Sequence, residues 1–194
     1  MSATVRPATT DDRAAVVATV ASAFAGDPAW DFIVGSGNRD GAEAFGSALF
    51  DARVVRGTVW IADDGAAVAM WDRVAPERAS ATGIDPWPTF RERVGEQVWD
   101  RLWRYDDAVK GSGPARPYWY LGVLATHPGR QGEGLASAVL EPGFAAAATD
   151  GWDCWLETSK PGNKPFYAGR GFTEVVPVAG LDDPPTWWLR RPRV

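Results

Sequence analysis

A glycine-rich turn in residues 130–136 has the composition of an anion-binding site. It opens an alanine-rich helical segment and reads Arg130-Gln131-Gly132-Glu133-Gly134-Leu135-Ala136. Glycines let a backbone approach a ligand closely, and the unpaired N–H groups at a helix N-terminus attract negative charge. The sequence therefore predicts that the backbone from Gln131 to Ala136 binds a phosphate-bearing ligand, with the Arg130 side chain adding a charge-assisted hydrogen bond.

Two common nucleotide-binding motifs do not match this turn. A Walker loop requires Lys followed by Ser or Thr after its last glycine, whereas Leu135 follows Gly134. The dinucleotide fingerprint has the order G-x-G-x-x-G beside a first strand, whereas the glycines here have the order G-x-x-G-x-G in the C-terminal half. The predicted ligand is therefore a phosphate-bearing molecule of another class.

Three side chains of different chemistry follow this turn: the carboxylate of Glu157, the amide of Asn163 and the phenol of Tyr167. A phenol with a pKa near 10 can protonate a thiolate whose conjugate acid has a pKa of about 8.5. A carboxylate near the end of a strand can act as a general base, directly or through water. Each of the three residues also has a structural alternative. Glu157 can be a structural carboxylate, Asn163 a helix N-cap, and Tyr167 a tyrosine packed under a sheet.

Two further reactive residues are predicted to be outside the chemistry. His127 has a side chain suited to base catalysis, but it precedes Pro128 in a turn, which favours a surface position. Cys154 lies in a predicted strand, where packing explains it, so we expect it to be buried and inert.

Two sequence blocks, the glycine-rich turn and residues 155–172, together resemble the GCN5-related N-acetyltransferases. Gln131-x-x-Gly134-x-Ala136 is similar to the acyl-CoA pyrophosphate loop of that superfamily, and residues 155–172 are similar to its fifth strand, catalytic tyrosine and sixth strand. Residues 59–69, 156–159 and 185–187 resemble puromycin N-acetyltransferase and its actinobacterial relatives. The likeness is weak between about Asp72 and Pro117.

The resemblance implies an α/β fold with a mixed, mostly antiparallel central sheet of about seven strands, flanked by helices and splayed between strands 4 and 5. It implies acetyl-CoA as cofactor and Tyr167 as the catalytic tyrosine. Glu157, near the end of the fifth strand, is the candidate base, with a structural carboxylate as the alternative. The amide near Val123 or Leu124 would face the thioester carbonyl, and Glu133 would point to solvent. The implied cofactor-binding residues are Val123, Leu124, Ala125, Arg130, Gln131, Gly132, Glu133, Gly134, Leu135, Ala136, Asn163, Phe166 and Tyr167.

The tryptophan content bears on the acceptor. Large aromatic side chains bury the most area in a core, but 11 tryptophans exceed what a core requires. Aromatic faces beside carboxylates suit a cationic, partly aromatic amine. The predicted substrate-binding residues are Trp30, Asp31, Trp71 and Trp87.

Composition excludes several function classes. A net charge of −5 argues against nucleic acid or an anionic membrane surface as partner. One cysteine and one histidine exclude an internal disulfide and a Cys/His metal cluster. The 194 residues fit one domain, 1–194, as a monomer or homodimer. The sequence shows no apolar h-region or membrane span, so the expected location is cytoplasmic.

The expected elements alternate between the two periodicities. A hairpin is predicted at residues 58–71 around Asp63-Asp64-Gly65, a bulge is expected at Gly122, and Pro142 is expected to kink its helix. The other expected strands are 5–7, 118–125, 152–157, 172–178 and 186–190. The expected helices run from Thr10 or Asp11 to near Gly26, over about 40–55, over 89–109, after the glycine-rich turn, and over 164–169.

These features predict an enzyme that transfers an acetyl group from acetyl-CoA to a primary amine of a small molecule. The acceptor would be antibiotic-like or a related metabolite, and the amine would attack directly in a ternary complex. One alternative is acetylation of a protein N-terminus or lysine. The other is a non-enzymatic acyl-CoA-binding module.

Overall fold

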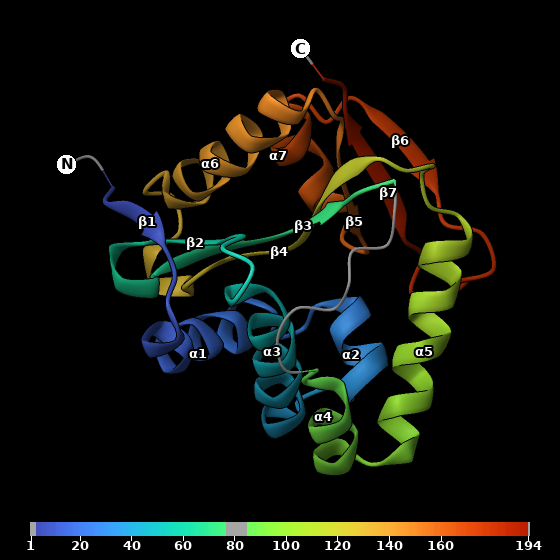
Figure 1. The fold of residues 1–194 in the computed structure, drawn as a ribbon. Coiled ribbons are helices and arrows are strands. Elements are labelled where there is room, and N and C mark those ends of the chain that lie inside the picture. Colours follow the sequence, from blue (N-terminus) through green and yellow to red (C-terminus); the bar gives the residue numbers. More distant parts are fainter. Residues whose placement is uncertain (1–2, 77–84, 194) are drawn as a thin grey trace.

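The computed structural model describes residues 3–76 and 85–193. Its centre is a seven-stranded sheet with the order β1-β2-β3-β4-β5-β7-β6, in which only β4 and β5 are parallel neighbours (Figure 1). The strands are β1 (Val5–Pro7), β2 (Val59–Ala62), β3 (Ala67–Val74), β4 (Tyr118–Thr126), β5 (Cys154–Thr158), β6 (Glu174–Pro177) and β7 (Trp187–Arg191). The predicted fold class is confirmed.

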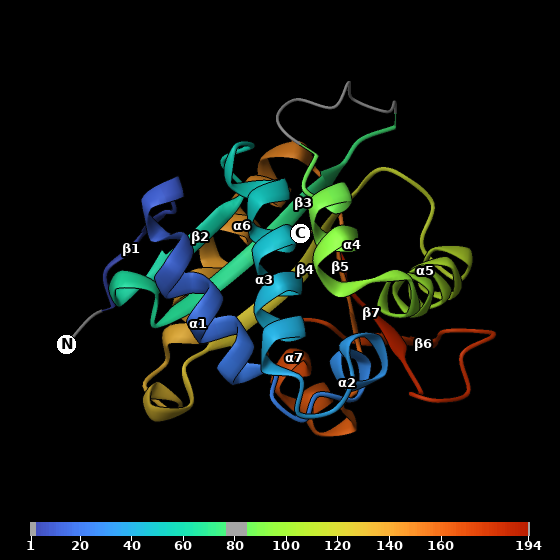
Figure 2. The ribbon, with the colours of Figure 1, turned by 90° about the horizontal axis from the view of Figure 1, so that it is seen from below.

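Helices cover both faces of the sheet, as Figures 1 and 2 show. One face carries α1, α2 and α3, with α4 beside α3 and α5 beside α2; α6 and α7 lie on the other. Each face has its own apolar core, one around Phe50 and Ile61 and one around Trp71 and Leu140. The helices are α1 (Arg13–Ala23), α2 (Pro28–Val34), α3 (Arg39–Val54), α4 (Trp87–Val94), α5 (Glu96–Gly111), α6 (Leu135–Asp150) and α7 (Lys164–Ala168).

The sheet opens between its two parallel strands. β4 and β5 pair only at Trp119 with Cys154 and at Tyr120 with Trp155. Just beyond this point the register with β3 shifts, because Met70 pairs with Val123 while Trp71 pairs with Leu121. Gly122 is therefore the extra residue of a β-bulge, as the sequence predicts. A bulge bends its strand, so β4 leaves β5 here.

Two expectations about the helices are wrong. No helix was expected between Gly26 and about residue 40, but Asp27-Pro28 starts α2 there. The Asp27 carboxylate accepts hydrogen bonds from the Ala29 and Trp30 N–H groups (3.1 and 3.3 Å), and proline is favoured in a first helical turn. The helix expected over 89–109 is two helices, separated at Gly95, whose φ of 78° lies outside the helical region. Pro142 lies inside α6.

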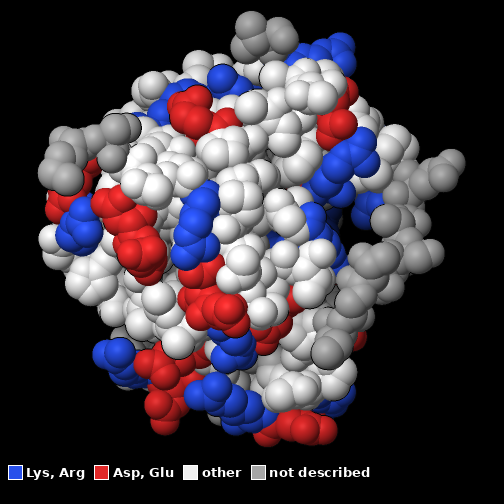
Figure 3. All heavy atoms as spheres, turned by 60° about the vertical axis from the view of Figure 1, so that its left-hand side comes forward, with Lys and Arg blue, Asp and Glu red and all other residues white. Residues whose placement is uncertain are grey.

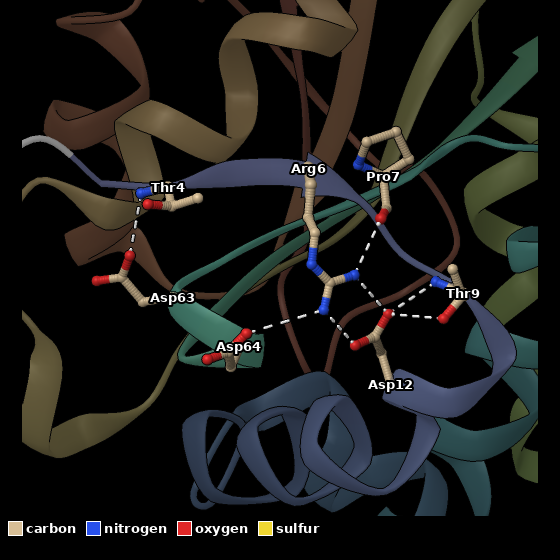
Figure 4. A network of polar contacts seen from close by, with 7 residues as sticks. All are labelled: Thr4, Arg6, Pro7, Thr9, Asp12, Asp63 and Asp64. Atoms are coloured by element: carbon tan, nitrogen blue, oxygen red, sulfur yellow. Dashed lines mark hydrogen bonds and ion pairs between the residues drawn. The ribbon is translucent and has the colours of Figure 1, made fainter.

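Charged side chains of both signs are interspersed on the face of the molecule shown in Figure 3. A polar network ties the N-terminal segment to the rest (Figure 4). The Arg6 guanidinium donates to both carboxylate oxygens of Asp12 (2.8 and 2.7 Å), and the Thr4 N–H donates to Asp63 (3.0 Å). The hydrogen bond from Arg6 holds the pKa of Asp12 well below its usual range. These bonds fix β1 against α1 and the β2–β3 turn.

Candidate active site

A cavity of about 1260 Å³ is lined from both faces of the sheet, where β4 and β5 separate. The α6 and α7 side contributes residues of the glycine-rich turn together with Asn163, Phe166 and Tyr167. The α2, α3 and α5 side contributes Trp30, Arg53, Tyr105 and others, and the strands contribute Tyr120, Leu124 and Glu157. The structure thus brings the two sequence blocks to one cavity.

The glycine-rich turn is shaped for an anion at the start of α6. Gly132 and Gly134 have φ angles of 85° and 82°, which favour glycine, and a Cβ at either position would meet no heavy atom within 4 Å. Gly134 is the N-cap of α6 and has no side chain to occupy the first N–H groups of this 16-residue helix. The space beside both glycines is open, as a cradle for a diphosphate requires.

Arg130 and Glu133 form a pair at the edge of this turn. The Arg130 guanidinium donates to Glu133 (2.8 Å from Nε) and to Asp63 (2.9 Å from Nη2) in the β2–β3 turn. The hydrogen bond that Arg130 donates to Glu133, followed by the one it donates to Asp63, raises the pKa of Arg130. Glu133 is exposed, as expected, and its charge is paired with that of Arg130, which reduces its repulsion of a bound phosphate. Asp63, which sequence reasoning missed, anchors Arg130 from 67 residues away.

The free edge of β4 faces the opening. The His127 N–H donates to the Ala66 oxygen of the hairpin (2.8 Å). Since N–H groups alternate along a strand, those of Leu124 and Thr126 are directed away from β3, toward the side that β5 has left. The Leu124 and Thr126 side chains line the cavity, and the Thr126 hydroxyl is buried without a partner among the described residues.

The side chains of Val123 and Ala125, by contrast, are buried in the apolar core on the α1–α3 side. Of the three β4 residues that the sequence assigns to the cofactor, Leu124 alone lines the cavity with its side chain. Its N–H is therefore the best-placed candidate donor for an oxyanion. The alternation of the strand explains the difference, because side chains of neighbouring residues point to opposite faces.

Tyr167 lies on α7, buried against the rings of Phe166 and Phe172 (centroid distances 5.2 and 5.7 Å), and it lines the cavity. Burial raises its pKa well above the usual value, so the phenol stays protonated near neutral pH. Asn163 lines the same side and donates to the Thr158 hydroxyl (3.3 Å). A protonated phenol and a side-chain amide thus stand together beside the glycine-rich turn.

Glu157 enters the cavity from β5. The Tyr120 hydroxyl donates to its Oε1 (2.8 Å), while Oε2 is buried without a partner among the described residues. Burial is the main cause that raises the pKa of Glu157 to about 7, partly opposed by the Tyr120 hydrogen bond and the Arg53 charge. A carboxylate with this pKa can accept a proton near neutral pH. The sequence did not indicate Tyr120, whose position opposite Glu157 depends on the β4–β5 pairing.

The predicted acceptor residues separate into two groups. Trp30 and Trp87 line the cavity, although Trp30 is only 6% exposed and stacks on Phe24 (4.4 Å between centroids). Trp71 is fully buried on the α6 side between Trp119 and Phe144, so it belongs to the core and does not line the cavity.

Asp31 also does not line the cavity, because α2 turns it away from the side that presents Ala29, Trp30 and Ile33. Asp27, at the start of that helix, does line it, 3.6 Å from the Lys160 amine. The cavity therefore contains a carboxylate at the N-terminus of α2.

The remaining reactive residues are placed as the sequence predicts. His127 is exposed, and its ring accepts the Gly129 N–H (3.1 Å). Cys154 is buried, which raises its pKa to about 11. Over residues 3–76 and 85–193, no group of three His, Cys, Asp or Glu side chains is arranged to hold a metal ion. In the same residues no helix has the length and apolar character needed to cross a membrane.

Known proteins share this architecture. A crystal structure from Corynebacterium glutamicum, named as histone acetyltransferase HPA2 and related acetyltransferase, superposes with a TM-score of 0.75 at 24% identity, over 100% of this chain and 98% of that one. Arylalkylamine N-acetyltransferase 2 from Aedes aegypti gives 0.63 at 12% identity, over 98% of each chain. The fold is that of the GCN5-related N-acetyltransferases.

A curated relative supports this at the level of sequence. An uncharacterized N-acetyltransferase of Schizosaccharomyces pombe is 24% identical over 181 residues, which cover 80% of this chain and 68% of that protein. No family model matches the chain. At these identities the likeness establishes the fold.

Proposed function

We propose that the protein is an N-acetyltransferase that moves the acetyl group of acetyl-CoA to a primary amine of a small molecule, by direct attack in a ternary complex. One observation carries this proposal. A single cavity, at the opening between β4 and β5, is lined by a glycine-rich anion cradle, a protonated phenol and a carboxylate of near-neutral pKa.

The α6 side of the cavity fits acetyl-CoA. The N–H groups from Gln131 to Ala136 would hold the diphosphate, because a Cβ at Gly132 or Gly134 would meet no heavy atom within 4 Å, which leaves room for the ligand. The free edge of β4 and the Asn163 amide offer hydrogen bonds to an amide-rich pantetheine arm. The unpartnered Thr126 hydroxyl would gain a partner from the same arm. When bound, the cofactor supplies the activated acetyl thioester.

Glu157 is the proposed base. Most alkylamines are protonated at neutral pH and must lose a proton before they attack. Oε2, which has no partner, is free to accept that proton directly or through a water, while Tyr120 holds Oε1. The charge of Arg53 limits the rise of the Glu157 pKa, so an ionised fraction persists at neutral pH.

Two other groups have assigned roles in the transfer. The Leu124 N–H would stabilise negative charge that develops on the carbonyl oxygen, because it is fixed on a strand and directed into the opening. The Tyr167 hydroxyl, kept protonated by its buried environment, would donate a proton or hydrogen bond to the departing sulfur.

The lining favours a small amine over a protein acceptor. The proposed acceptor side of the cavity, opposite the glycine-rich turn, is lined by aromatic side chains, among them Trp30, Trp87, Tyr105 and Trp188. Small ligands are bound in such concave, aromatic-lined sites. The arylalkylamine N-acetyltransferase from Aedes aegypti shares the fold and is named for small amines. An antibiotic-like acceptor, as the resemblance to puromycin N-acetyltransferase suggests, belongs to the same class.

A protein lysine or N-terminus is the second candidate, since the Corynebacterium glutamicum structure is named as a histone acetyltransferase. Thiol release from acetyl-CoA, measured with a panel of small amines and lysine-containing peptides, distinguishes the two. We expect release that depends on a small amine. Release with peptides alone would replace the small-molecule assignment, and no amine-dependent release at all would refute the acetyltransferase.

A further inference from the structure

Arg53 is a buried cation on the acceptor side of the cavity whose hydrogen-bonding capacity is only partly used. It lies in the last turn of α3 and is 7% exposed. Its Nε and Nη2 donate to Asp72 Oδ2 (3.0 and 2.6 Å), and its Nη1 donates to the Leu49 carbonyl (3.1 Å).

A guanidinium has five N–H donors, and these contacts account for three of them. Within the described part of the chain, one N–H on each terminal nitrogen is left over. The edge between the two terminal nitrogens of a guanidinium is a fork with which arginine binds a carboxylate in bidentate fashion. Asp72 occupies one edge of the guanidinium, so a second carboxylate can be accepted at the other.

The Arg53 guanidinium lies beside β4, the strand that also carries Tyr120. A Cβ at Gly122 would stand 2.8 Å from Arg53 Nη2, so the guanidinium lies against the β4 bulge. Tyr120, which holds Glu157, is two residues before that bulge, and all four residues line the cavity. Arg53 and Glu157 therefore face one cavity, and they are close enough for the Arg53 charge to lower the Glu157 pKa.

The local charge fits a single negative charge on the ligand. Arg56 Nη1 also donates to Asp72 (3.1 Å), so two guanidinium groups share one carboxylate and leave a net charge of about +1. Arg116 also lines the cavity. None of these residues belongs to the glycine-rich turn, so the phosphates of the cofactor do not account for them.

We propose, building on the acetyltransferase function above, that the acceptor is an amine that also carries a carboxylate, of the amino-acid type. Arg53 binds the carboxylate while the amine faces Glu157. The apolar residues of the same wall, Phe45, Leu49 and Trp87, suit an apolar or aromatic side chain on that molecule. A primary amine without the anionic group would leave the Arg53 fork unpaired.

Matched pairs of acceptors test this inference. The values of kcat/KM are measured for L-phenylalanine and phenethylamine, and for L-leucine and isoamylamine, which differ within each pair by one carboxylate. We expect the wild type to favour the amino acid by about 10- to 100-fold, the usual range for a charge-assisted pair. Arg53→Met should abolish that ratio through a raised KM for the amino acid, and Arg53→Lys should keep part of it.

Arg39→Met is the control, because Arg39 is an exposed residue paired with Glu43 on the first turn of α3. The ratio of kcat/KM between the amino acid and its matched amine cancels any general loss of activity. If the Met variant fails to fold, the ratio measured with the Lys variant tests the inference. The inference is overturned if the wild type acetylates the carboxylate-free amines equally well, or if Arg53→Lys and Arg53→Met leave the ratio unchanged. Acetylation of neither series, nor of any other amine, would instead refute the acetyltransferase function itself.

Discussion

Replacing Glu157 by glutamine is the perturbation that separates chemistry from structure most clearly. The substitution keeps the shape and the hydrogen bond from Tyr120 but removes the ionisable group. Loss of a positioned base typically lowers turnover by about 100- to 10,000-fold, and we expect kcat to fall in this range while acetyl-CoA affinity is retained.

The pH dependence carries the sign of the effect. The base acts in its ionised form, so kcat/KM of the wild type should rise about tenfold per pH unit below a pKa of about 7 and level off above it. The Gln variant should lack this limb. A variant that loses less than about threefold in kcat at pH 8, or one that keeps the limb, would refute Glu157 as the base.

The same carboxyl should be visible in stability. Its folded-state pKa is raised to about 7 from 4.5, so the folded state binds the proton more tightly than the unfolded state. The contribution of this proton to the free energy of unfolding is fully present below pH 4.5 and is lost as pH rises through 7. The loss is at most about 3 kcal/mol, and water in the cavity reduces it by screening. Urea unfolding at pH 5 and pH 8 should show a smaller loss for the Gln variant than for the wild type. Equal losses would show that Glu157 has an ordinary pKa.

Three further substitutions test the other parts of the site. Gly134→Val should abolish the rise in melting temperature caused by acetyl-CoA, because a side chain would enter the anion cradle. The control is Gly37→Val, which lies outside the cavity at a similar φ of 70° and should keep that rise. An unchanged rise in the Gly134 variant would refute the cradle. Tyr167→Phe should lower kcat about ten- to a thousand-fold with cofactor affinity intact, and a surviving rate would assign the proton to another group. Tyr120→Phe removes a hydrogen bond that lowers the pKa of Glu157, so the rising limb of kcat/KM should move to higher pH, and an unmoved limb would contradict the contact.

The features that the sequence predicted correctly are set by neighbouring residues. The β2–β3 hairpin follows from Asp63-Asp64-Gly65, and Gly65 with a φ of 93° is the glycine that such a turn needs. The glycine-rich turn is likewise specified locally, by two glycines with positive φ before a helix. The bulge at Gly122 was expected from a glycine inside an apolar strand.

The features that were missed depend on residues far apart in the chain. The Tyr120–Glu157 hydrogen bond joins residues 37 positions apart, and it requires the parallel pairing of β4 with β5. The Arg130–Asp63 bond spans 67 positions. Trp71 was assigned to the acceptor pocket because a tryptophan beside Asp72 suggests a binding surface, but its place in β3 directs the ring toward α6. Composition indicates that aromatic residues line a site, while only the packing shows which ones.

Transfer of an isotopically labelled acetyl group is the most direct test of the central claim. The protein is incubated at pH 8 with labelled acetyl-CoA and the preferred amine, and both the amine and the protein are analysed by mass spectrometry. The cavity geometry predicts label on the amine nitrogen, none on the protein, and at least about 100-fold slower labelling with Glu157→Gln. Label that stays on the protein, or an amine that is labelled equally fast by the Gln variant, would contradict direct transfer with Glu157 as the base.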